Sequence, residues 1–289
     1  MRIALARRVT PASISRLLRS AALLVAAGLA PATVTADEAP GSDSESGKAQ
    51  REARLGQMRE RAKDFEVIVP GQKEPVRLRA DPLFRYSDQP RGFVDATLWG
   101  WVMKGRPAVI AKAEMAQTPG GDPYWQFCVA SLADGPLDIR LVNGRRLAVN
   151  KPGLVLRPFD SAPEPGARPA ERLRQMKELI ARFTATIHVD GKESLRQEMR
   201  LLPSPMHRYA DGELRDGVIF ALTTNGTNPD MLIVVELRAE KGAEAAWYYG
   251  IVKMTYAEVH IRLDNFEVWK SPVSEPLETW TYFSIPRPE

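Results

Sequence analysis

The stretch RLRADPLFRY, residues 77–86, returns at residues 200–209 as RLLPSPMHRY, with five of its ten positions identical. Composition alone matches about one position in fifteen, so this density of identity indicates a common origin for the two segments. Other matches surround it in the same order, at offsets of 118 to 123 residues: Arg54-Leu55 returns as Arg172-Leu173, Glu114 as Glu236, Trp125 as Trp247, and Arg140 as Arg262. The sequence therefore predicts an internal duplication.

Segments of different composition bound the two copies. The first 36 residues carry five arginines, no acidic residue, an apolar run at 21–30 and a small-residue motif at 34–36, the order of a secretory signal peptide. Residues 37–50 are rich in Ser, Gly and acidic residues and predict a disordered leader. We place repeat one at 51–158, a Pro-rich joint at 159–169, repeat two at 170–273 and a C-terminal tail at 274–289.

The signal peptide predicts that the mature chain is secreted or periplasmic, by either the general secretory or the twin-arginine route. Its apolar run of about ten residues is too short for a bilayer, which needs about twenty, so we expect no transmembrane anchor. Among 40 basic and 36 acidic residues, the five arginines of the signal peptide account for the basic excess and leave 35 basic residues. A nearly neutral mature chain argues against nucleic acid as a partner.

Each copy opens with a helical pattern and continues with strand-like alternation. In the second copy, apolar residues recur at three- and four-residue spacing and give one helix face: Leu173, Met176, Leu179, Ile180 and Phe183. The dipeptides Asn143-Gly144 and Asp190-Gly191 predict tight hairpin turns, and most connections are too short for parallel crossovers. We therefore predict an α+β fold in which each repeat packs one amphipathic helix on an antiparallel β-meander. A pseudo-two-fold arrangement of the repeats is favoured over tandem domains.

Shared polar residues are the candidate binding residues. Arg85 and Arg208 are identical in the two copies, as are Glu114 and Glu236. One interpretation is a brace, in which an arginine and a carboxylate join helix and sheet in each copy. The other places the arginines around a shared groove for an anionic or sugar ligand. The brace is favoured, and a stable Arg208→Ala variant would instead support the groove.

Catalytic motifs are absent from the sequence. No nucleophile elbow, P-loop or dinucleotide-binding glycine pattern occurs. The three histidines, His188, His207 and His260, lack the spacing of a metal site, and the lone Cys128 excludes a cysteine-based zinc site. We therefore predict no catalytic residue, no metal site and no cofactor.

Three segments in combination resemble a known family: RLRQMKEL at 172–179, RLLPSPMHRY at 200–209 and DGVIFA at 216–221. The family is an uncharacterised group of predicted secreted proteins found chiefly in planctomycete bacteria. The resemblance covers most of the mature chain and implies an envelope or extracellular location. It carries over no activity, ligand or site residue.

Two functions agree with these observations. The favoured hypothesis is an exported, non-catalytic binding or interaction module of the bacterial envelope, with an unknown envelope component or small ligand as partner. The alternative is a hydrolase of envelope polymer or polysaccharide, with carboxylates such as Glu114 or Glu236 as acid or base. It requires two carboxyl groups that face one cleft about 5–10 Å apart. The sequence leaves the oligomeric state open.

Overall fold

The computed structural model describes residues 45–103, 105–118, 120–188, 195–210, 214–239, 244–273 and 278–287. By its internal contacts the chain divides into Met1–Ser44 and one compact unit, Glu45–Glu289. The predicted signal peptide and the predicted turn at Asp190-Gly191 lie outside the described residues.

The first half of the described chain opens with helix α1 (Glu45–Lys63). It begins inside the segment predicted as a disordered leader, because Glu45 suits a helix N-terminus and Lys, Ala and Gln follow, which are helix-forming residues. The strands of this half are β1 (Glu66–Ile68), β2 (Arg77–Leu78), β3 (Phe84–Asp88), β4 (Phe93–Met103), β5 (Arg106–Gln117), β6 (Pro123–Ser131), β7 (Leu137–Arg140), β8 (Arg146–Val149) and β9 (Arg157–Pro158).

The second half opens with helix α2 (Pro169–Ile180), which has Pro169 in its first turn and the Glu171 carboxylate accepting the Arg168 N–H at 3.1 Å. Its predicted apolar face is buried at Met176, Leu179 and Ile180. The strands are β10 (Phe183–His188), β11 (Arg196–Glu198), β12 (Arg200–Leu201), β13 (His207–Tyr209), β14 (Leu214–Thr223), β15 (Met231–Arg238), β16 (Ala246–Lys253), β17 (Glu258–Leu263), β18 (Phe266–Ser271) and β19 (Trp280–Pro286).

The prediction of one helix on one meander per repeat is wrong. The described residues are mostly β, with 49% in strands and 17% in helical turns, and they contain two α-helices and four antiparallel sheets. The first central sheet has the order β19-β6-β5-β4-β2, with β3 on β4, and the second has the order β12-β14-β15-β16-β9, with β13 on β14. The first outer sheet is β1-β7-β8 and the second is β11-β10-β17-β18.

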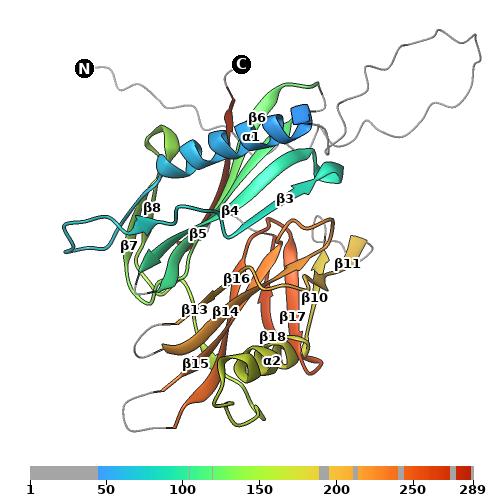
Figure 1. Cartoon of the computed structure of the whole chain (residues 1–289). Coiled ribbons are helices and arrows are strands. Elements are labelled where there is room, and N and C mark those ends of the chain that lie inside the picture. The colour runs from blue at the N-terminus through green and yellow to red at the C-terminus, as the bar shows by residue number, and fades with distance from the viewer. Residues whose placement is uncertain are drawn as a thin grey trace, which may run out of the picture. The chain divides into compact units, whose positions relative to one another are not determined.

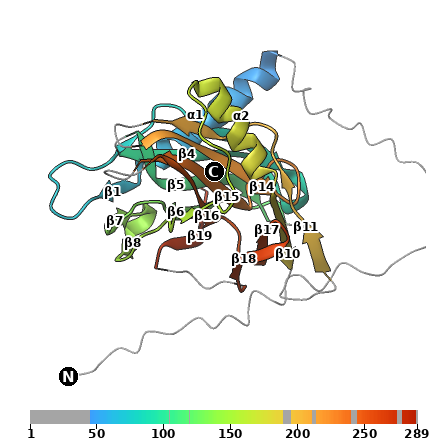
Figure 2. The same cartoon turned by 90° about the horizontal axis from the view of Figure 1, so that it is seen from below.

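Three apolar clusters explain this division into sheets. One lies between the first central sheet and α1 with the first outer sheet, and a second lies between the second central sheet and α2 with the second outer sheet. The third joins the remaining faces of the two central sheets to each other. Figure 1 shows α1 and α2 on opposite sides of the central sheets, and Figure 2 shows β10, β11, β17 and β18 grouped together. A single meander with one helix would leave the other face of each central sheet exposed to solvent. Runs such as Val218–Leu222 are apolar on both faces of the strand, and both faces are buried.

The central sheets exchange strands between the two halves. The last strand of the first half, β9, pairs with β16, while the last strand of the chain, β19, pairs with β6. The β19 pairing runs over seven positions, from Trp280 opposite Ala130 to Pro286 opposite Tyr124. The β9 pairing has two, with Pro158 opposite Tyr248 and Arg157 opposite Tyr249. Each half therefore completes the sheet of the other.

The predictions of local structure agree with the structure better than the predicted architecture does. The antiparallel hairpin of β7 and β8 around Asn143-Gly144 is confirmed, with Gly144 at φ +71°. Strands β3 and β13 were not predicted. They are short and follow proline-containing segments.

Candidate functional site

Arg85 binds an aspartate that fastens α1 to the first central sheet. From β3, its Nε (2.9 Å) and Nη2 (2.6 Å) donate to the two carboxylate oxygens of Asp95. Nη2 also donates to the carbonyl of Arg51 in α1 at 2.5 Å. Asp95 accepts a further hydrogen bond from Arg54 of the same helix at 2.8 Å. The arginine therefore has the geometry of a brace.

Arg208 makes the equivalent contacts in the second half. Its Nε and Nη2 donate to Asp216 at 2.9 and 2.6 Å, and Nη2 donates to the Pro169 carbonyl at the start of α2 at 2.7 Å. Arg172 of α2 donates to the same carboxylate at 2.8 Å. Burial favours a raised pKa for Asp216, but hydrogen bonds from Arg208 and Arg172 outweigh it and lower the pKa.

The two aspartates were missed from the sequence. Asp95 and Asp216 lie 121 positions apart, whereas Arg85 and Arg208 lie 123 apart and Glu114 and Glu236 lie 122 apart. Both follow a register shift at a β-bulge, between Phe93 and Asp95 in β4 and between Leu214 and Asp216 in β14. A bulge re-aims a side chain, and here it turns each carboxylate towards the helix. The match of the two aspartates at a slightly different offset was the only sign of them in the sequence.

Glu114 and Glu236, the other predicted site residues, lie in the interior, each with 0% of its surface exposed. Tyr86 donates to Glu114 at 2.8 Å, and Tyr209 donates to Glu236 at 2.7 Å. Burial raises the pKa of Glu114. A second partner of Glu236 is Arg106, a residue of the other half, at 3.4 Å. Neither carboxylate is on the wall of the cavities of about 420 and 390 Å³ that the described residues form.

Lys112 lies between the central sheets, where the two halves meet. This side chain of β5 is 2% exposed, and its Nζ donates to Asn228 Oδ1 at 2.7 Å and to the Met254 carbonyl at 2.9 Å. The Asn228 amide in turn donates to Asp88 at 3.0 Å. The nearest carboxylate to Nζ is Glu114, at 3.9 Å. Polar residues from both halves therefore surround one buried ammonium group.

Arg91 and Asp230 form a second contact between the halves beside this lysine. Arg91 donates to the two carboxylate oxygens of Asp230 at 2.7 and 3.3 Å. The backbone N–H of Thr224 donates to the same carboxylate at 2.8 Å. Burial works to raise the pKa of Asp230, but the hydrogen bond and charge of Arg91 outweigh it and lower the pKa. The Asp230 carboxylate is therefore ionised, and both of its oxygens accept hydrogen bonds.

A cavity of about 420 Å³ opens beside these groups. Its polar wall combines two cations, two amides, three tyrosines and one carboxylate: Arg91, Lys112, Gln126, Asn228, Tyr124, Tyr256, Tyr282 and Asp230. Convergent polar groups on a cavity wall are the general signature of a binding site. We refer to this space as the Lys112 cavity.

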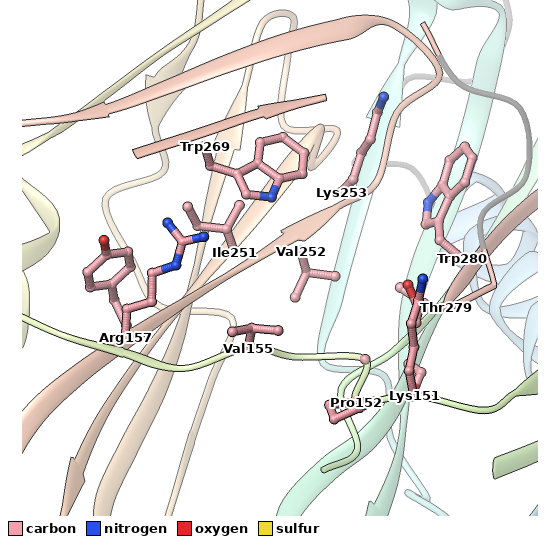
Figure 3. A pocket seen from close by; sticks show the side chains of 14 residues that line it. Lys151, Pro152, Val155, Arg157, Ile251, Val252, Lys253, Trp269, Thr279 and Trp280 are labelled. Carbon is pink, nitrogen blue, oxygen red and sulfur yellow. The ribbon is translucent and has the colours of Figure 1, made fainter. Parts of the chain in front are cut away.

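A second cavity, of about 390 Å³, lies along the edge of β16 (Figure 3). Figure 3 shows Trp269 beside Ile251 on one side of it and Trp280 on the other. The charged residues of its wall are all basic: Lys151, Arg157 and Lys253. We refer to it as the β16 cavity.

The histidines and the cysteine do not form a reactive or metal-binding cluster. His188 and His260 stack at 4.7 Å between ring centres on neighbouring strands, whereas His207 stacks on Tyr209 at 5.6 Å in the second central sheet. Within the described ranges, no group of three or more His, Cys, Asp or Glu side chains could hold a metal ion. Cys128 is buried, which raises the pKa of its thiol to about 12. Such a thiol is not a nucleophile at neutral pH.

No protein-family model, curated protein or solved structure matches this chain. Across the described residues, no helix has the length and apolar character needed to cross a membrane. The resemblance to planctomycete secreted proteins therefore stays a prediction, and the geometry of the two cavities carries the functional argument.

Proposed function

We propose that this chain is an exported, non-catalytic binding module of the bacterial envelope, which holds a small polar ligand in the Lys112 cavity. The observation that carries the proposal is the buried ammonium group on the cavity wall. Lys112 has three N–H donors, and among the described residues two acceptors lie within hydrogen-bond distance. A ligand oxygen in the cavity supplies the third acceptor.

The wall chemistry favours an anionic or hydroxyl-rich ligand, such as an acidic sugar. Lys112 and Arg91 provide positive charge, while the amide of Gln126 offers both donors and an acceptor. Tyrosine rings present apolar faces on which a sugar ring packs. The export that places the protein near such ligands is inferred from the predicted signal peptide.

A hydrolase is poorly supported by this geometry. Acid–base cleavage of a glycosidic bond needs two carboxyl groups that face one cleft. The described wall of the Lys112 cavity has one, Asp230, which is already bound by Arg91 and Thr224. The alternatives Glu114 and Glu236 are buried and hydrogen-bonded to tyrosines.

Isothermal titration calorimetry of the mature chain tests the proposal, with glucuronate-containing and neutral oligosaccharides and peptidoglycan fragments as probes. Gln126→Ala is the informative variant, because the Gln126 side chain lines the cavity and makes no hydrogen bond to another described residue. We expect it to weaken binding about tenfold, the effect of one lost polar contact of ~1.4 kcal/mol. Gln117→Ala, an exposed position on the adjacent strand, is the matched control and leaves affinity unchanged. No binding by any probe, or release of cleavage products, refutes the proposal.

A further inference from the structure

The two outer sheets differ at one equivalent pair of residues. In the first, Glu66 of β1 lies opposite Arg140 of β7, and Arg140 Nη1 donates to the Glu66 carboxylate at 2.7 Å. In the second, Thr184 of β10 lies opposite Arg262 of β17. Thr184 follows Glu66 by 118 positions and Arg262 follows Arg140 by 122, which are offsets of the duplication. The second half therefore has the same arginine without the carboxylate.

The acidic residues of the neighbouring strands do not replace Glu66. Arg262 forms no hydrogen bond or ion pair with another described residue. Glu267 lies opposite it on β18, but the Glu267 carboxylate lies 2.7 Å from Nδ1 of His260. The Glu258 carboxylate lies 2.8 Å from Nε2 of the same histidine. Both acidic side chains of β17 and β18 therefore contact His260, and the guanidinium group of Arg262 is left without an anion.

A cavity of about 270 Å³ lies at this arginine, and we refer to it as the Arg262 cavity. The hydroxyl groups of Thr184 and Thr186 and the amide of Asn265 are on its wall, and none of them forms a hydrogen bond with another described residue. The one carboxylate of the described wall belongs to Glu198, whose side chain is 83% exposed. Several hydrogen-bond donors and a cation therefore converge on one space.

Strand β11 supplies a wall of this cavity for which the first outer sheet has no equivalent. It pairs with the outer edge of β10, with Glu198 opposite Thr186 and Arg196 opposite His188 (Figure 2). The described part of the first outer sheet has the order β1-β7-β8, so β1 is at its edge. In the second half, β11 therefore encloses the arginine that lacks a carboxylate and adds Arg196 as a second cation.

We propose that the Arg262 cavity binds a phosphate group, which takes the role that the Glu66 carboxylate has in the first half. The planar guanidinium group suits carboxylates and phosphates alike, because both accept two parallel N–H bonds. A phosphate ester offers three strong acceptor oxygens, whereas a carboxylate has two in one plane. The additional donors of Thr184, Thr186 and Asn265 therefore favour phosphate. This site is separate from the Lys112 cavity and does not depend on its ligand.

Inorganic phosphate, titrated into the mature chain and followed by amide NMR, tests the site. We expect saturable shifts at Thr184, Thr186 and Arg262, with a Kd of about 1 mM or tighter. Arg262→Gln should weaken binding about tenfold or more. Arg140→Gln removes the equivalent exposed arginine of the first half and should bind phosphate normally. The absence of saturable shifts, or equal weakening by the two variants, overturns the proposal.

Glycerol 3-phosphate, titrated in parallel, distinguishes a phosphate ester from free phosphate as the ligand. Tighter binding of the ester assigns an organic phosphate to the site, and tighter binding of the inorganic ion assigns free phosphate. Both results support the site. Shifts confined to the residues around Lys112 and Gln126 place the anion in the Lys112 cavity instead and overturn the proposal.

Thr184→Glu restores at an exposed position the carboxylate that the first half has. The new side chain should bind Arg262 as Glu66 binds Arg140, so the variant should fold normally and lose phosphate binding. Thr184→Gln has the same length without the charge and should keep phosphate binding. Phosphate binding by Thr184→Glu that is as tight as in the wild type overturns the proposal, and so does an equal loss in Thr184→Gln.

Discussion

Asp216 should be among the most costly single side chains to remove, because it holds α2 on the second central sheet. The residue is 3% exposed, and its carboxylate accepts three hydrogen bonds from charged donors, one from Arg172 and two from Arg208. Hydrogen bonds to charged groups contribute about 1.5–3 kcal/mol each but are not additive. Arg208 keeps 32% of its side chain in solvent and regains hydration when released. We therefore expect Asp216→Ala to lower the free energy of unfolding by ~3 kcal/mol, at the lower end of values for broken buried ion pairs.

Urea denaturation followed by tryptophan fluorescence measures this loss. For a domain of this size, ~3 kcal/mol corresponds to a fall of about 6–12 °C in Tm. Glu178→Ala removes a carboxylate from an exposed pair on the same helix, with Arg174 at 3.9 Å, and should cost less than ~0.5 kcal/mol. If Asp216→Ala costs no more than Glu178→Ala, the contacts with Arg172 and Arg208 do not brace the helix.

The pH dependence of the same variant gives a second test of the brace. The pKa of Asp216 is lower in the folded chain than its unfolded value of about 3.9. The ionised carboxylate therefore stabilises the fold fully above that value, and this stabilisation is lost as pH falls through the folded pKa. The stability difference between wild type and Asp216→Ala should shrink between pH 5 and pH 2. A difference that stays constant over this range contradicts the ionised brace.

Two further predictions concern His207 and Gly153. Burial, with a contribution from the charge of Arg79, lowers the pKa of His207 to about 4, so its ring-proton NMR shift should titrate near pH 4. The folded pKa lies below the unfolded value of about 6.5, so this group withdraws stability as pH falls from 6.5 towards 4; a midpoint near 6.5 contradicts the burial. Gly153→Ala places a Cβ 2.2 Å from the Ser131 carbonyl oxygen and should cost ~2 kcal/mol in urea denaturation. Gly135→Ala has no atom within 4 Å of the new Cβ, and an equal cost there would refute the steric reason.

Structural features that depend on a local or repeated sequence pattern were predicted correctly. The apolar face of α2 follows from periodicity, and the turn at Gly144 follows from residue type. The identity of Arg85 with Arg208 pointed correctly to an arginine–carboxylate brace. Its aspartate partners were missed because they match at an offset of 121, whereas the neighbouring matches have offsets of 122 and 123.

The sequence by itself determined the apolar face of α2 and the hairpin at Asn143-Gly144, because apolar period and turn residues act over a few neighbours. Only the tertiary structure decided how the strands divide among four sheets and which half completes each central sheet. Pairings such as Trp280 with Ala130 join residues 150 positions apart, and no local period records such a partner. The same holds for Lys112, whose contacts with Asn228 and Met254 exist only because two apolar sheet faces pack together. Burial of those faces therefore created both the fold and the candidate site.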